Sequence, residues 1–223
     1  YYRMPKKDYS SSNFMSKLKK KKDTKQDKRI RKLENIVYPS LEWKSLDIKA
    51  FDVSISNSGY ENYPMLQIAQ GEGNNQREGD KVSLRRGTLH VSLTRGDTSN
   101  IIRLLIVATP SATYAGLSDV LEYHSYSTNA DGVFSSPYQV KATNSEQTYK
   151  VLADRVYQLP NDKSTITAKI PIKLPKKGKN CEFVGVGSVA PNNYNISLLM
   201  ISDSTATPHP KASYVMRWKY LDL

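Results

Sequence analysis

The chain has 223 residues, with 33 Lys and Arg against 21 Asp and Glu, a formal net charge of +12. This length suits one large domain or two small ones, and all-β domains often reach it as a single unit. The one cysteine, Cys181, excludes an intramolecular disulfide framework, and no apolar run is long enough to span a bilayer. We therefore expect no membrane partner and no disulfide-rich scaffold.

The positive charge is concentrated at the N-terminus. Residues 1–32 hold 13 Lys and Arg against 3 Asp and Glu, whereas residues 33–223 hold 20 against 18. The first segment is also poor in branched apolar residues, so it cannot bury enough surface to offset the entropy of ordering. We expect residues 1–36 to form a basic arm, disordered or ordered against a partner, and residues 37–223 to form the folded domain. A solvated tail without a function is the alternative.

The density of cations in the arm is typical of segments that bind polyanions. Nine of the fifteen residues from 17 to 31 are Lys or Arg. Cations of this kind neutralise phosphates and release counterions from nucleic acid. The run KLKKKK at 17–22 would also serve as a nuclear-import patch. The sequence predicts nucleic-acid binding by ten arm residues, namely Lys17, Lys19, Lys20, Lys21, Lys22, Lys25, Lys28, Arg29, Arg31 and Lys32.

From Trp43 onward the sequence alternates apolar and polar residues, with Gly, Asn, Pro and Asp between the alternating segments. This pattern favours an all-β sandwich or barrel. The expected strands are 45–56, 64–69, 81–95, 100–109, 147–158, 164–174, 181–189, 193–203 and 212–221. With one long connection at 110–146 and no helical half, they predict an all-β fold. We expect a single eight-stranded jelly roll of two packed antiparallel sheets.

The expected strand at 81–95 changes its apolar phase between Leu84 and Leu89. One extra residue in a strand produces such a change, so the sequence predicts a β-bulge at 85–87. Gly87 would then supply a permissive backbone.

A second basic group follows the arm in chain order and contains Arg77, Lys81, Arg85 and Arg86. On one strand face these cations could extend a phosphate-binding surface, so Arg77, Arg85 and Arg86 join the predicted nucleic-acid-binding residues. Structural use in ion pairs between subunits is an equal alternative.

The residue pattern contains no catalytic constellation. The stretch GEGNNQREGDKVSLRRG at 71–87 has a Gly-x-Gly, but it lacks the third glycine and the following helix of a dinucleotide site. His90, His124 and His209 lie far apart in the chain and show no zinc spacing. We predict that Cys181 is a small, buried apolar residue. We expect a protein that is not an enzyme and that uses no metal and no cofactor.

Several segments carry a family resemblance. QGEGNNQREGDKVSLRRGTLHVSL at 70–93 leads from a Gln-Gly into a basic-apolar strand, and IIRLLIVATP at 101–110 places an Arg before a hydrophobic run. YKVLADRVYQL at 149–159 is an aromatic-x-Val-Leu-x-Asp-Arg strand, followed by YNISLLMISDS and YVMRWKYLDL. In this order they resemble the single jelly-roll capsid proteins of small circular single-stranded DNA viruses that encode a replication protein. The arm departs from that family because it is rich in Lys rather than Arg.

The resemblance implies a viral capsid protein that assembles with copies of itself into an icosahedral shell. It also implies a single-stranded DNA genome packaged through the basic arm, a place in the virion, and assembly in the host nucleus; the host receptor stays unknown. Capsid proteins of small or satellite RNA viruses share this architecture and form one alternative. A cellular nucleic-acid-binding β-barrel with a basic tail is a second, and an enzyme or lectin on a jelly-roll fold is a third.

Overall fold

The computed structural model describes residues 24–30, 32–33, 43–121 and 148–223. The chain divides into two compact units, Tyr1–Glu42 and Trp43–Leu223. In the first unit, residues 24–30 and 32–33 are helical and exposed. The described part of the second unit consists of β-strands, their connections and a one-turn helix, α2 (Leu117–Val120).

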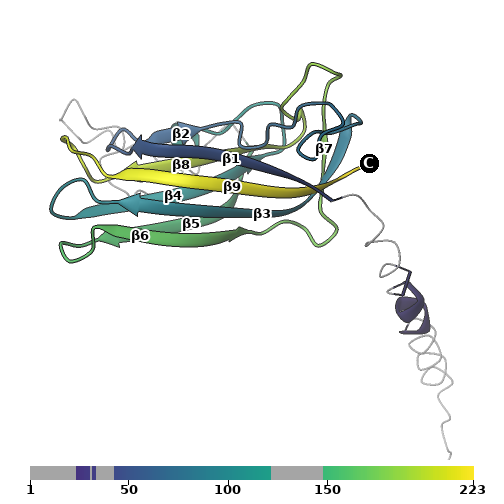
Figure 1. Ribbon diagram of the computed structural model, residues 1–223, viewed down its shortest axis with the longest axis horizontal. Helices are drawn as coiled ribbons and strands as arrows, with labels where there is room; N and C mark the ends of the chain where they lie inside the picture. The colour runs from purple at the N-terminus through teal and green to yellow at the C-terminus, as the bar shows by residue number, and fades with distance from the viewer. Residues whose placement is uncertain (1–23, 31, 34–42, 122–147) are drawn as a thin grey trace, which may run out of the picture. The chain divides into compact units, whose positions relative to one another are not determined.

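One antiparallel sheet has the strand order β1-β9-β3-β6, with β7 paired to the beginning of β3. We call it the open sheet, because the outward-facing side chains of β9 from Lys211 to Lys219 are exposed or half-buried. Figure 1 shows its long strands lying side by side. Its strands are β1 (Trp43–Ser54), β3 (Lys81–Thr94), β6 (Thr165–Ile172), β7 (Lys179–Glu182) and β9 (Lys211–Asp222).

The other antiparallel sheet has the strand order β2-β8-β4-β5. Its strands are β2 (Tyr60–Asn62), β4 (Asn100–Thr109), β5 (Lys150–Leu159) and β8 (Asn195–Ser202). We call it the covered sheet, because a second apolar cluster lies on its outer face. Side chains of β4 and β8 pack there against the segment that contains α2, in a cluster made of Leu105, Val107, Ala115, Leu117, Val120, Leu121, Leu199 and Ile201.

The chain passes from one sheet to the other at every connection except those between β4 and β5 and between β6 and β7. Only β4 and β5 are consecutive partners within the covered sheet. This alternation is the topology of a jelly roll, and it confirms the predicted all-β fold of two packed antiparallel sheets. β7 is a short addition at the edge of β3.

The predicted strand at 64–69 is wrong. Met65, Leu66 and Ile68 are fully buried, yet the segment runs in irregular conformation just after β2. Its backbone bonds at separate points, from Met65 N to the Ile196 carbonyl oxygen (2.8 Å) and from Ile68 N to that of Val189 (2.7 Å). The predicted strand at 181–189 also ends early, because β7 stops at Glu182.

The inner faces of the two sheets form the main core. From β9 alone, Tyr214, Met216, Trp218 and Tyr220 point into it, because alternate residues of a strand face the same side. The buried indole of Trp218 donates from Nε1 to the Met65 carbonyl oxygen at 2.6 Å. Trp218 therefore both fills the core and holds the irregular segment after β2 against it.

The predicted bulge is confirmed by a register shift between Leu84 and Arg86 in the pairing of β3 with β9. The role of Gly87 in the structure differs from the predicted one. Gly87 is not among the glycines with positive φ. It faces the core opposite Trp218, whose ring occupies the space that a Cβ would need. Glycine is required there for space rather than for backbone freedom.

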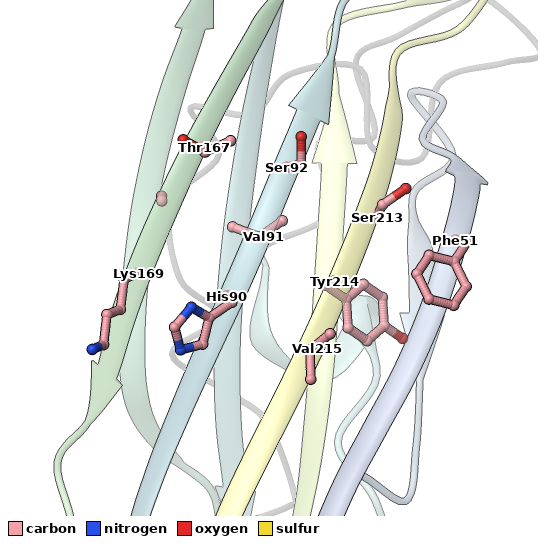
Figure 2. A pocket seen from close by; sticks show the side chains of 10 residues that line it. Phe51, His90, Val91, Ser92, Thr167, Lys169, Ser213, Tyr214 and Val215 are labelled. Carbon is pink, nitrogen blue, oxygen red and sulfur yellow. The ribbon is translucent and has the colours of Figure 1, made fainter.

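The two sheets differ in what lies on their outer faces. Apolar side chains cover much of the outer face of β4 and β8. The open sheet instead presents polar, basic and aromatic side chains to solvent, and Figure 2 shows Phe51, His90 and Ser213 among them. A hollow of about 520 Å³ lies on this face.

Candidate functional site

The described cations of the arm lie on one side of a helix. Lys25, Lys28, Arg29 and Lys32 are all exposed in the helical residues 24–30 and 32–33. Their spacing is i, i+3, i+4 and i+7, which places side chains on one helical face. This face therefore concentrates positive charge in a form that can follow a line of phosphates.

The other predicted arm residues lie outside the described residues. They are Lys17, Lys19, Lys20, Lys21, Lys22 and Arg31. Nucleic-acid binding by the arm therefore stays a prediction from charge and composition.

Arg77, the first member of the second basic group, is fully buried, with an exposed fraction of 0%. Its guanidinium lies 4.4 Å from the centroid of the Phe183 ring. The guanidinium donates to Gly79 O, to Asp80 Oδ1 (3.1 Å), to Gly185 O (2.8 Å) and to Ser188 O (2.9 Å). These bonds fasten the turn before β3 to the loop after β7. Arg77 is thus occupied inside the fold, and we leave it out of the proposed phosphate-binding surface.

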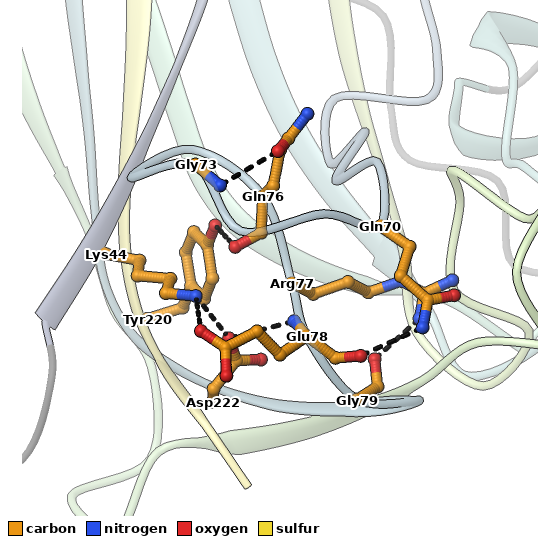
Figure 3. Close-up of polar contacts among 9 residues, drawn as sticks. All are labelled: Lys44, Gln70, Gly73, Gln76, Arg77, Glu78, Gly79, Tyr220 and Asp222. Atoms are coloured by element: carbon orange, nitrogen blue, oxygen red, sulfur yellow. Dashed lines mark hydrogen bonds and ion pairs between the residues drawn. The ribbon is translucent and has the colours of Figure 1, made fainter.

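A buried lysine stabilises the same turn. Lys44, 1% exposed, places Nζ 2.7 Å from Glu78 Oε1 and 2.9 Å from Asp222 Oδ2. Its hydrogen bonds to Asp222 and Glu78 raise the pKa of Lys44 above its ordinary value, against the opposing effect of burial. Figure 3 shows these contacts beside the hydrogen bond from Tyr220 Oη to the Gln76 carbonyl oxygen (3.1 Å). The segment that contains Gln76 and Glu78 is therefore a structural turn, held against the beginning of β1 by Lys44 and against the end of β9 by Tyr220.

Arg85 and Arg86 point in different directions from the bulge. Arg85 is half-buried and donates from Nη1 to the Lys177 carbonyl oxygen at 2.7 Å. Arg86 is exposed and lies directly opposite Lys219 of β9. Lys81 forms an ion pair with Glu182 at 3.1 Å within the chain. The second basic group therefore does not form one surface, and only Arg86 contributes to the outward face of the open sheet.

Sequence reasoning missed the cations that strand pairing brings to this face. They come from three further strands and are Lys49 of β1, Lys169 of β6, and Lys211, Arg217 and Lys219 of β9. The available signal was the spacing of Arg217 and Lys219, two residues apart on one strand, which places both on one face. Nothing local in the sequence relates them to residues more than a hundred positions away.

Neither a metal centre nor a reactive thiol is found in the described residues. Within 24–30, 32–33, 43–121 and 148–223, no three His, Cys, Asp or Glu side chains are grouped as metal ligands. Cys181 is fully buried, which raises the pKa of its thiol to about 12 and confirms its prediction as a buried residue. None of the helices in these ranges has the length and apolar composition needed to cross a membrane.

Comparisons with known proteins give one match over nearly the whole chain. The family model described as "Satellite tobacco necrosis virus coat protein" matches residues 15–223. No curated protein matches the chain. Among solved structures, Desmodium yellow mottle tymovirus is 9% identical, with 81% of this chain and 87% of that chain covered and a TM-score of 0.37. An IBDV viral particle is 10% identical, with 82% and 40% covered and a TM-score of 0.15.

The family match overturns the resemblance to capsid proteins of single-stranded DNA viruses. That resemblance rested on short segments at 70–93, 101–110 and 149–159. In the structure these segments form strands of the two sheets and the turn before β3 that Arg77 holds in place. Their residue patterns therefore follow from sheet packing and carry no information about the genome. The expectations of a DNA genome and of assembly in the host nucleus are withdrawn with it. The match supports the alternative of a satellite RNA virus.

Proposed function

Because the chain belongs to the satellite tobacco necrosis virus coat protein family, we propose that it assembles into an icosahedral shell around a single-stranded RNA genome. The observation that carries the proposal is the family match over residues 15–223. The jelly roll agrees with it, since its two sheets form a compact block whose edges and loops can contact neighbouring copies. A coat protein is a structural component of the virion and not an enzyme.

Within this proposal, residues 1–36 form the genome-binding arm and residues 37–223 form the shell domain. The arm acts by electrostatics, because each phosphate that it neutralises releases counterions. For single-stranded nucleic acid, the logarithm of affinity falls by about 0.7 per neutralised phosphate for each tenfold rise in salt. If ten arm cations engage, the expected slope is about −7.

The lysine-rich composition of the arm suits packaging without sequence preference. Lysine presents a point charge and three rotatable donors, whereas arginine offers a planar fork suited to bidentate contacts. The arm can therefore hold phosphates in many local geometries. Concentrating arms on one RNA would bring subunits together and offset the repulsion between them.

The proposal is tested by the mass and nucleic-acid content of the purified recombinant protein. Sedimentation with absorbance at 260 and 280 nm should reveal megadalton particles that carry RNA. A species of one or a few subunits that binds nucleic acid at low salt would contradict the proposal and favour a cellular binding module.

Variants of the full-length chain then locate the genome-binding segment. Replacing Lys19, Lys20, Lys21 and Lys22 with Gln should reduce the RNA content of the particles. The matched control removes the same charge from exposed positions of the shell domain, with Gln at Lys150, Arg155, Lys163 and Lys176. Equal RNA loss in both variants would show that net charge rather than the arm governs packaging.

A further inference from the structure

The outward face of the open sheet carries more cations than acids. Arg217 forms a two-bond pair with Asp47, at 2.7 Å each, which neutralises both. The other cations of this face form no ion pair within the described part of the chain; they are Lys49, Arg86, Lys169, Lys211 and Lys219. One further acid, Asp52, lies at the irregularity near the end of β1. The face therefore has a net positive charge contributed by four different strands.

The register places like charges next to each other on this face. Arg86 of β3 lies directly opposite Lys219 of β9. Like charges at opposed positions destabilise a sheet, whereas opposite charges stabilise it. The free subunit thus holds an arrangement that a bound polyanion would stabilise.

The covered sheet provides the contrast. Its strands β2, β4 and β8 contain a single cation, Arg103, which is paired with Asp154 of β5 at 3.0 Å. Apolar side chains and the segment around α2 occupy the outer face of β4 and β8. In the described residues, the exposed cations of the covered sheet are confined to β5, at Lys150 and Arg155, whereas those of the open sheet come from four strands.

The hollow on the open sheet is suited to an unpaired base. Its floor includes a row of small hydroxyl side chains across three strands, because Ser92 lies opposite both Ser213 and Thr167. Phe51, 71% exposed, stands at one end, and Lys169 stands at the other (Figure 2). Its volume of about 520 Å³ lies within the usual range of small-molecule sites. An exposed aromatic ring beside cations is the combination that binds single strands, by stacking and charge.

We propose that this face binds the packaged RNA, with phosphates on the cations of the open sheet and an unpaired base stacked on Phe51. The inference rests on the proposed function, and it adds to the arm a second RNA surface built from folded strands. Binding is without sequence preference, because every base offers a face for stacking and the hydroxyls of the floor both donate and accept.

The charge component is tested with the full-length protein and a short unstructured RNA, whose affinity is measured over a range of salt concentrations. The face variant carries K169Q and K219Q. The control carries K150Q and R155Q, which removes two exposed cations from β5. The face variant should make the slope of log affinity against log salt shallower by about 1.4, while the control leaves it unchanged. Equal changes in both variants, or none in either, would overturn the inference.

The stacking component is tested with F51A, against V156A as a control at another exposed apolar residue. F51A should weaken binding of unpaired RNA roughly fivefold or more without changing the salt slope. It should leave affinity for duplex RNA unchanged, because paired bases are already stacked. Equal effects of F51A and V156A on affinity would contradict the stacking of a base on Phe51 in the hollow.

The arm variant with Gln at Lys19, Lys20, Lys21 and Lys22 separates this inference from the proposed function. If the wild-type chain neither assembles nor binds RNA, the proposed function fails. If wild type packages RNA and only the arm variant changes the salt slope, the proposed function stands and the inference about the open sheet fails. Thermal unfolding of K219Q gives an independent check. Relief of its repulsion with Arg86 should leave the free protein as stable as wild type, or more stable.

Discussion

The indole ring of Trp218 occupies the space above the Cα of Gly87, its cross-strand partner. The ring is fully buried, and its Nε1 donates to the Met65 carbonyl oxygen at 2.6 Å. It therefore cannot move aside without losing that bond. One glycine in β3 thus permits the largest side chain of the core to lie against the neighbouring backbone and to hold the irregular segment after β2.

Replacing Gly87 with alanine should destabilise the fold by about 1–3 kcal/mol, the usual cost of forcing extra volume into a packed core. Urea unfolding measures the loss. The control is Gly187→Ala, because no heavy atom lies within 4 Å of a Cβ at Gly187 and its φ is not positive. A similar loss in both variants would show that the contact with Trp218 is not the cause.

Replacing Arg77 with methionine should cost about 3 kcal/mol, since hydrogen bonds that involve a charged group contribute about 1.5–3 kcal/mol each. The Gly185 and Ser188 carbonyls would lose the guanidinium as a donor, and the loop after β7 would lose its anchor. Urea unfolding should show the loss of stability, and limited proteolysis should cut this loop faster than in wild type. Arg155→Met, at an exposed position, should change stability by less than about 0.5 kcal/mol. An Arg77 variant as stable as this control would contradict the assigned role.

Stability should fall as pH rises above 9. Burial raises the pKa of the Cys181 thiol from 9.0 to about 12, so between these values the unfolded chain loses a proton that the folded chain keeps. The contribution is complete below pH 9 and is lost as pH rises through the folded pKa, at up to about 1.4 kcal/mol per pH unit.

The measurement is the unfolding free energy between pH 8 and pH 10. The upper limit keeps the experiment below the range in which buried Tyr194, whose pKa burial raises from 10.0 to about 12, adds a similar effect. Cys181→Ala should lower stability at pH 8 and flatten the pH dependence. An unchanged pH dependence in this variant would assign the effect to other groups.

The carboxyl of Asp47 should titrate below its ordinary range. Its hydrogen bonds from Arg217 lower its pKa, and the cation's charge adds to the effect. A lowered folded pKa contributes stability above the unfolded value of 3.8, and this contribution is lost as pH falls through the folded pKa. An NMR titration should show the Asp47 pKa rising toward 3.8 in Arg217→Gln and staying low in Lys211→Gln. Equal pKa values in the two variants would contradict the pairing.

Much of the fold could be predicted because strand formation follows a local pattern. Alternation of period 2 located most of the strands, and the change of phase between Leu84 and Leu89 located the bulge. The segment at 64–69 could not be separated from a strand, because burial in an irregular conformation selects the same apolar residues. Its conformation is decided by partners at Ile196 and Val189, far along the chain.

The residues of the candidate site likewise divide into those that a local pattern identifies and those that only strand pairing identifies. The density of lysine in the arm is a property of neighbouring residues, so the sequence by itself is enough to predict that segment and its binding to a polyanion. Arg77 and Arg86 carry the same charge nine residues apart, yet one is buried under the loop at Gly185 and the other faces outward beside Lys219. Only the tertiary structure decided this, because the surroundings of each arginine are set by strand register with residues about a hundred or more positions away. The same pairing brought Lys169 and Phe51 to the hollow, where a row of small hydroxyl side chains leaves room between them.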